Sequence, residues 1–245
     1  MISVESIDLE WLREKKLDYR PSNETRGKLA DKVLTMVVGV SAVGKSTIIE
    51  KTLEINGEGW ATGGSLTTRS RRSDDPAHYQ TADEGIDINS FIDLANKNEL
   101  TNFSVVGEHI YGSTPDSFPA RYNLLPTLTD SVAENERAGF ARTNVAYVLA
   151  PGEAWKERLQ QRTGDERYTS RLREALVSLS YGLEHVDDIH FIDNPDLESI
   201  REAADKLAQI TVTGVDPEPL DRSFVIDRLS DMSEVARTEL RQYEQ

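Results

Sequence analysis

One segment of the sequence has the residue types and spacing of a phosphate-binding loop. Gly39-Val40-Ser41-Ala42-Val43-Gly44-Lys45-Ser46 fits G-x-x-x-x-G-K-[ST] without a mismatch. In such a loop the glycines let successive backbone N–H groups point into one concavity, and the following helix adds partial positive charge at its N-terminus. Lys45 can reach the β- and γ-phosphates, and the Ser46 hydroxyl can bind Mg²⁺. The expected nucleotide contacts are Gly39, Ser41, Ala42, Val43, Gly44, Lys45, Ser46 and Thr47.

The flanking sequence predicts the elements that such a loop requires. The apolar, β-branched run Val33–Val38 leads into Gly39, and Ile48, Ile49 and Leu53 then recur at helical spacing. A buried strand, a glycine-rich loop and a helix are the context in which this motif binds phosphate. The segment therefore predicts a nucleoside triphosphate site, and a chance glycine-rich turn is the weaker interpretation.

The charge balance limits the kinds of partner. The net charge is −15, from 43 acidic and 28 basic residues. Such a surface repels nucleic acid and anionic lipid, so we expect neither a nucleic acid nor a membrane as partner. Positive charge is nevertheless gathered in two clusters, which favour focused phosphate sites over scattered surface arginines. They contain Arg69, Arg71 and Arg72, and Arg158, Arg162, Arg167, Arg171 and Arg173.

Composition also bears on metals and on location. The chain has no cysteine, and its four histidines lack ligand spacing, so a structural metal is not expected. No apolar run approaches the ~20 residues that cross a bilayer, and the first residues lack the pattern of a signal peptide. These features predict a cytoplasmic protein.

Apolar runs alternate with helical patterns along the chain, which predicts an α/β fold around a parallel sheet. Beyond Ile210 a linker, 214–219, precedes an amphipathic helix that covers the core or, alternatively, binds a partner. We expect a polar strand near 63–72 and apolar strands at Val33–Val38, Val105–Tyr111, Leu124–Leu128, Asn144–Ala150 and Asp188–Asp193. We expect one helix from the phosphate loop to about Glu54, and further helices over Phe91–Asn98, Val132–Phe140, Glu153–Arg162, Thr169–Leu183 and Pro195–Ile210.

Four separated motifs together resemble guanylate kinase and its relatives, over about Val33 to Ile210. The resemblance implies a P-loop three-layer sandwich, with a parallel sheet flanked by helices, an acceptor-binding insertion and a lid. The motifs are the phosphate loop, Ser65-x-Thr67-Thr68-Arg69-x-x-Arg72 with Tyr79, Tyr111-Gly112-Ser113, and Arg158-Leu159-x-x-Arg162-Thr163 followed by Arg171.

The resemblance also implies an activity and its residues. It implies transfer of the γ-phosphoryl group of ATP, with Mg²⁺, to a phosphorylated small molecule, with a nucleoside monophosphate as the leading acceptor. Lys45 and three lid arginines, Arg158, Arg162 and Arg171, would act on the transferring phosphates, and Asn194 would lie beside the adenine. The implied acceptor contacts are Arg69, Arg72, Tyr79 and Tyr111 for the monophosphate, with the hydroxyls of Ser65 and Ser113 nearby.

The chain departs from the family pattern at three places. The loop between Arg72 and Tyr79 is shorter than is usual in the family. Pro126 and Leu128 stand at the positions of the family's aspartate pair, so Asp130 is the nearest acidic residue in the sequence that could lie on the Mg²⁺ side of the site. The position of the guanine-reading glutamate holds Asn102. Because an amide offers one donor and one acceptor, it cannot accept both guanine hydrogen bonds. We therefore expect Asn102 in the acceptor pocket and GMP as a poor acceptor.

The predicted organisation is a kinase domain with a short extension at each end. The extensions are 1–32 and 212–245, and the kinase domain, 33–211, contains an acceptor-binding part at about 62–117 and a lid at about 158–173. Two alternatives remain: an enzyme like the ribose bisphosphokinases, and a non-catalytic guanylate-kinase-like binding module. We expect a monomer or a homodimer.

Overall fold

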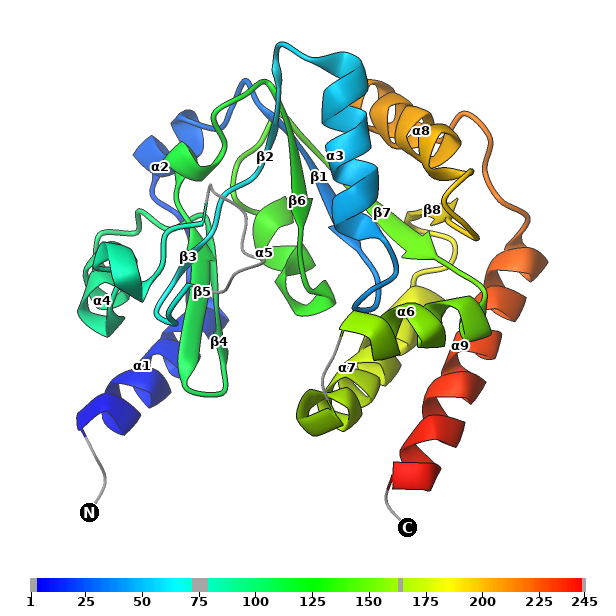
Figure 1. Cartoon of the computed structure of the whole chain (residues 1–245). Helices are drawn as coiled ribbons and strands as arrows, with labels where there is room; N and C mark the ends of the chain where they lie inside the picture. Colours follow the sequence, from blue (N-terminus) through cyan, green and yellow to red (C-terminus); the bar gives the residue numbers. More distant parts are fainter. Residues whose placement is uncertain (1–3, 72–78, 163–164, 244–245) are drawn as a thin grey trace. The chain divides into compact units, whose positions relative to one another are not determined.

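The computed structural model describes residues 4–71, 79–162 and 165–243 (Figure 1). The chain divides into two compact units. Unit 1 contains residues 1–34, 59–125 and 130–143, and unit 2 contains residues 35–58, 126–129 and 144–245. No helix in the described ranges is both long enough and apolar enough to cross a membrane.

A five-stranded parallel sheet carries the phosphate loop. Its strand order is β2-β6-β1-β7-β8. All six residues of β1 are buried, as expected for a central strand covered on both faces. The α/β fold with a parallel sheet flanked by helices is therefore confirmed. The strands are β1 (Val33–Val38), β2 (Trp60–Thr62), β6 (Tyr122–Pro126), β7 (Arg142–Leu149) and β8 (His190–Asp193).

In unit 2 the helices pack in two groups, and α8 (Ile200–Thr213) also packs against β8. Helix α3 (Lys45–Asn56) packs against α8, and the C-terminal helix α9 (Arg222–Tyr243) packs against α6 (Gly152–Arg162) and α7 (Asp165–Glu184) (Figure 1). The apolar stripe of α9 faces these neighbours, so the helix covers the core of its own chain. Its buried apolar residues are Val225, Leu229, Met232, Ala236 and Leu240.

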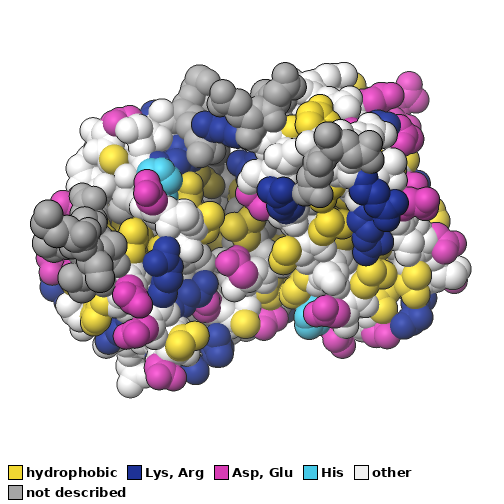
Figure 2. Space-filling model, turned by 90° about the horizontal axis from the view of Figure 1, so that it is seen from below, with side chains coloured by type: hydrophobic (Ala, Val, Ile, Leu, Met, Phe, Trp, Pro, Cys, Tyr) yellow, Lys and Arg dark blue, Asp and Glu magenta, His cyan; other side chains and the backbone are white. Residues whose placement is uncertain are grey.

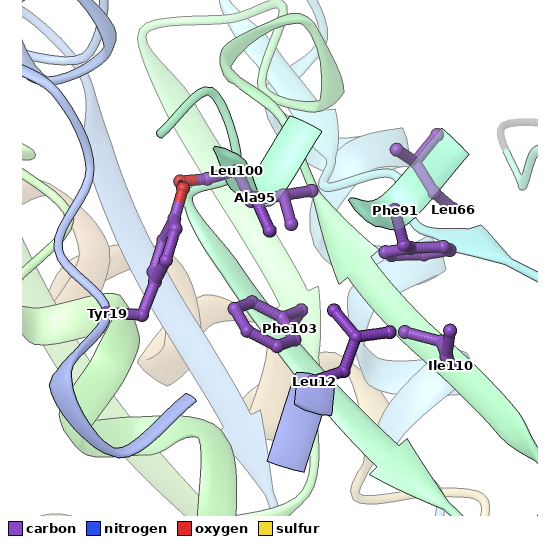
Figure 3. Packing of buried hydrophobic residues seen from close by; sticks show 8 residues of the cluster. All are labelled: Leu12, Tyr19, Leu66, Phe91, Ala95, Leu100, Phe103 and Ile110. Carbon is purple, nitrogen blue, oxygen red and sulfur yellow. The ribbon is translucent and has the colours of Figure 1, made fainter. Parts of the chain in front are cut away.

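Unit 1 has its own small sheet and core. Strands β3 (Leu66–Thr67), β5 (His109–Ser113) and β4 (Asn102–Val106) form an antiparallel sheet in that order, against which α1 (Val4–Asp18) packs. Figure 3 shows the buried cluster that fills this unit, with the ring of Tyr19 edge-on to that of Phe103. The Tyr19 hydroxyl donates to the carbonyl of Leu100 (2.9 Å), and burial raises its pKa. The described part of unit 1 also contains the helices α2 (Asn23–Gly27), α4 (Ile88–Asn96) and α5 (Val132–Glu136), with short 3₁₀ turns at Ala82–Glu84 and Pro115–Ser117. A further 3₁₀ turn, Thr129–Ser131, begins at the last residue of a unit 2 segment.

The prediction of one strand over Val105–Tyr111 is wrong. The segment is the centre of a hairpin, in which β4 and β5 pair antiparallel and Val106 lies opposite His109. Gly107 has φ of +64°, the left-handed conformation that a tight hairpin turn requires at its first central residue. The apolar residues on both sides made the interrupted run look continuous.

Other boundaries also differ from the predictions. Helix α8 begins at Ile200 instead of Pro195, and Leu197, inside the predicted helix, is 82% exposed. Helix α5 ends at Glu136 instead of Phe140, because Gly139 has φ of +104° and breaks the helical backbone. Strand β6 ends before Leu128, which is exposed, and the polar strand near 63–72 is reduced to Leu66–Thr67.

Candidate active site

The phosphate loop lies in unit 2 between β1 and α3, and two of its glycines are required by close contacts. Gly39 and Gly44 have φ of +129° and +107°. A Cβ at Gly39 would lie 2.8 Å from the carbonyl oxygen of Val148, and one at Gly44 would lie 2.2 Å from Nδ2 of Asn194. Ala42 also has a positive φ, +62°, which is costly for a residue with a side chain. These left-handed residues let the backbone curl into a concave loop, the arrangement that binds phosphate.

Lys45 is the cationic side chain of this loop, and its surroundings lower its pKa. Its ammonium donates to the carbonyls of Gly39 (2.7 Å) and Val40 (2.8 Å). Burial, followed by the positive charges of Arg162 and Arg171, lowers the pKa of Lys45 to about 7. Arg162 and Arg171 are thus close enough to Lys45 to disfavour its positive charge. A polyanion bound there would remove the repulsion and restore the charge of the lysine.

The three predicted lid arginines have different surroundings. Arg158, on α6, donates to the carbonyls of Asn194 (3.1 Å) and Pro195 (2.7 Å), so it anchors the loop that follows β8. Arg162 ends α6 and is exposed, and Arg171, on α7, bonds to Glu174. Thr163, the last residue of the predicted motif, lies outside the described residues.

Asn194 connects the strand ends to the phosphate loop. Its backbone N–H donates to Leu149 at the end of β7 (2.9 Å), and its side-chain Nδ2 donates to the carbonyl of Val43 in the loop (2.8 Å). The side chain is buried, and its Oδ1 has no hydrogen-bond partner within the described part of the chain. Asn194 therefore holds the loop in place and keeps one acceptor atom unused.

The predicted acceptor residues that the structure describes belong to unit 1. Arg69 is buried, and its guanidinium lies 5.9 Å from the ring centre of Tyr111 on β5. Ser113, two residues further along β5, donates through its hydroxyl to the carbonyl of Gly64 (2.9 Å). Ser65 precedes β3 and accepts a backbone bond from Gln80 (2.9 Å). Tyr79 is half-buried, and its backbone carbonyl accepts a bond from the guanidinium of Arg71. Arg72 lies outside the described residues.

Asn102 begins β4, directly opposite Ser113. Its side chain is buried, and Nδ2 donates to Oδ1 of Asn135 on α5 (2.7 Å) and to Oγ1 of Thr101 (3.3 Å). The donor half of this amide is thus already engaged by protein groups, which the sequence could not indicate.

A carboxylate near Asn102 was missed by the sequence reasoning. Glu134 on α5 forms an ion pair with Lys16 of α1 (3.2 Å), and Lys16 also donates to Oγ of Ser104 on β4 (2.8 Å). Oε2 of Glu134 is buried without a partner among the residues described, and burial raises the pKa of the carboxyl. Glu134 and Lys16 are far apart in the sequence, so no local pattern indicates that they pair. Asp130, the expected nearest acid, is exposed in unit 1 and accepts a bond from Ser131 (3.3 Å).

On the face shown in Figure 2, basic side chains (dark blue) form small separate groups among acidic, apolar and neutral ones. Within the described residues, no group of three or more His, Cys, Asp or Glu side chains is arranged to hold a metal ion. Positive charge in this acidic chain is therefore local.

Comparisons with known proteins identify the fold. No protein-family model matches the sequence, and no curated protein matches it. Among solved structures, the chain is similar to guanylate kinase from Anaplasma phagocytophilum, with 18% sequence identity and a TM-score of 0.50 over 76% of this chain and 86% of that one. The chain therefore has a guanylate-kinase-like fold.

Proposed function

We propose that this protein is a phosphotransferase that moves the γ-phosphoryl group of ATP to a nucleoside monophosphate. The observation that carries the proposal is the phosphate loop of unit 2, in which Gly39 and Gly44 have positive φ and Lys45 begins α3. Burial, followed by the charges of Arg162 and Arg171, lowers the pKa of this lysine to about 7. A charged Lys45 is therefore disfavoured unless a polyanion enters the site. A triphosphate on the adjoining concave loop has the matching charge.

The residues around the loop fit a nucleotide and its metal ion. The side chain of Ser46 is exposed on the first turn of α3, and a hydroxyl oxygen is a suitable ligand for Mg²⁺. Bound Mg²⁺ would neutralise charge on the β- and γ-phosphates. Asn194, whose side chain bonds to Val43 of the loop, is the residue that would lie beside the adenine.

The proposed chemistry needs no general base. The attacking atom is an anionic phosphate oxygen of the acceptor, so positioning and charge stabilisation suffice. Lys45, Arg162 and Arg171 would stabilise the charge that moves during transfer, and Arg158 would keep the loop after β8 in place. Arg69, Arg72, Tyr79 and Tyr111 would hold the acceptor phosphate, with Ser65 and Ser113 beside them.

Two groups of unit 1 are candidates for recognition of the acceptor base. Asn102 has an amide whose donor is engaged, whereas Glu134 has a buried carboxylate oxygen without a partner in the described part of the structure. A base that presents an N–H donor would satisfy that oxygen. The intact Gly44, Lys45 and Ser46 favour an enzyme over a non-catalytic binding module.

A screen of acceptors tests this proposal. Purified full-length protein is incubated with ATP, Mg²⁺ and each common ribo- and deoxyribonucleoside monophosphate, and with ribose 1,5-bisphosphate, while ADP is measured. We expect acceptor-dependent ADP production with at least one monophosphate. Turnover only with ribose 1,5-bisphosphate would favour the ribose bisphosphokinase alternative. ATP binding without turnover on any acceptor would overturn the proposed activity.

A further inference from the structure

We propose that Arg228, on the C-terminal helix α9, is a positioning residue for the nucleotide site of unit 2. It acts through Asp193 on Asn194, and through Asn194 on the phosphate loop. The inference deepens the proposed function and depends on it only for the identity of the bound nucleotide.

The first step is a partly desolvated ion pair between α9 and the end of the sheet. Nη2 of Arg228 lies 3.1 Å from Oδ2 of Asp193, and the two side chains are 20% and 19% exposed. The guanidinium also lies 4.9 Å from the ring centre of Phe224, one turn earlier on α9. Limited exposure reduces screening by solvent, so this pair constrains its partners more strongly than a surface pair would.

The second step connects Asp193 to the loop through a single residue. Asp193 is the last residue of β8, paired in register with Leu149, and Asn194 follows it. The side-chain amide of Asn194 donates to the carbonyl of Val43, and a Cβ placed on Gly44 would lie only 2.2 Å from its Nδ2. A shift of Asp193 is thus passed directly to the backbone around Gly44. Displacements of about 1 Å near a reacting group are enough to impair binding and turnover.

The third step is the incomplete hydrogen bonding of the pair. Oδ1 of Asp193 and Nε of Arg228 are both buried and have no partner among the residues that the structure describes. Unpaired buried polar atoms cost stability, and a partly buried ion pair is weak evidence for a stabilising role. A geometric role accounts for a charged contact at this position better than a stabilising role does.

The same helix supplies a matched control pair. Arg222, at the start of α9, binds Asp187 just before β8, with Nε–Oδ1 and Nη2–Oδ2 distances of 2.8 and 3.3 Å. Both side chains are largely exposed, at 60% and 67%. The control has the same chemistry and joins α9 to the opposite end of β8, but Asp187 is not adjacent to Asn194.

The test compares Arg228→Leu, Arg228→Lys and Arg222→Leu in the full-length protein. The dissociation constant for Mg·ATP is measured by calorimetry, KM for ATP and for the acceptor by kinetics, and thermal stability by unfolding. For Arg228→Leu we expect about tenfold weaker ATP binding, since Asp193 loses the contact that fixes Asn194 and the loop, with KM for the acceptor changed less than about twofold. Arg228→Lys should recover part of the affinity, and Arg222→Leu should bind ATP as the wild type does.

Two outcomes would overturn the inference. One is unchanged ATP affinity in Arg228→Leu, and the other is equal weakening by Arg222→Leu, which would indicate a general effect of α9. If Arg228→Leu does not fold, Asp193→Asn removes the charge at constant volume and must show the same selective loss. A wild type that binds ATP without transferring phosphate would refute the proposed activity, while the affinity comparison would still decide the role of Arg228.

Discussion

At the scale of single residues, the phosphate loop is the part that sequence predicts best. The residue types of its octet are constrained by what phosphate binding requires, and in the structure Gly39 and Gly44 have the positive φ angles that the motif implies. The environments of other site residues could not be predicted in this way. The bonds of Asn102 to Asn135, and of Glu134 to Lys16, join residues that are distant in sequence and follow no local pattern.

Lys45 should couple ATP binding to proton uptake. With a pKa of about 7, Lys45 is mostly neutral at pH 8 in the free protein, whereas bound phosphates favour its charged form. Binding of Mg·ATP at pH 8 should therefore take up a proton, and ATP affinity should fall as the pH rises above 7. Calorimetry in buffers of different ionisation enthalpy measures this uptake. Equal proton uptake by the wild type and Lys45→Met would contradict the assignment.

The same pKa makes a prediction for folding. Between pH 7 and 10 the unfolded chain holds a proton on Lys45 that the folded chain has released, so this residue's contribution to the free energy of unfolding rises with pH. The difference between wild type and Lys45→Met in urea denaturation at pH 7 and 9 isolates that contribution. A difference that does not change with pH would argue against a perturbed lysine.

Asn102 provides a test of base recognition. GMP is expected to be a poor acceptor, because an amide leaves one guanine donor without an acceptor, at a cost of about 1–3 kcal/mol. Asn102→Glu should raise kcat/KM for GMP relative to the preferred acceptor, with Asn102→Ala as control for loss of the amide alone. Efficient use of GMP by the wild type, unaffected by Asn102→Glu, would assign base recognition to another residue such as Glu134.

At the scale of elements, sequence patterns succeeded where one period persists between clear stops. Helix α3 ends before Gly57 and α8 before Gly214, and both glycines have positive φ. The amphipathic period of α9 correctly indicated the face that is buried. Sequence patterns failed at the β4–β5 hairpin and at Pro195–Ser199. The conformation of Pro195–Ser199 depends on side-chain hydrogen bonds that no periodic pattern reveals: Asp196 accepts from the N–H of Ser199 (2.9 Å), and Arg158 donates to the carbonyl of Pro195.

A pair of leucine substitutions tests the role of α9. Leu229 is completely buried and lies against Gly182 of α7, whereas Leu197 is 82% exposed. Leu229→Ala should lower the free energy of unfolding by about 2–5 kcal/mol, and Leu197→Ala should change it by less than about 0.5 kcal/mol. Urea denaturation gives both values. Similar small effects from both substitutions would mean that α9 does not belong to the core.

At the scale of the whole molecule, the proposed donor and acceptor residues belong to different units of the chain. Lys45, Arg162, Arg171 and Asn194 are in unit 2, whereas Arg69, Tyr111 and Ser113 are in unit 1. The net charge of −15 makes local groups of cations necessary for binding phosphates anywhere on this chain. The sequence predicted a parallel sheet with a glycine-rich loop after Val33–Val38, but not its edge strand β2. The division into two units follows from long-range contacts that no local pattern encodes.

A ligand that carries both substrates should therefore protect both units. We expect a bisubstrate analogue to slow hydrogen exchange in residues 163–173 of the predicted lid and also in β3 and β5, since bound phosphates would engage arginines from each unit. Residues 163–164 lie outside the described residues but are included in the exchange measurement. If the exchange rates of residues 163–173 are the same with and without the analogue, the lid does not close on bound ligand and the prediction is wrong.

Phosphoryl transfer by the wild type and by Lys45→Ala tests the central claim most directly. The measurement follows labelled γ-phosphate from ATP into the preferred acceptor, with circular dichroism to verify that the variant is folded. Because Lys45 acts on the charge of the transferring group, we predict that the variant folds and that its turnover falls by roughly two to three orders of magnitude. A folded Lys45→Ala protein that transfers phosphate at nearly the wild-type rate would contradict the account.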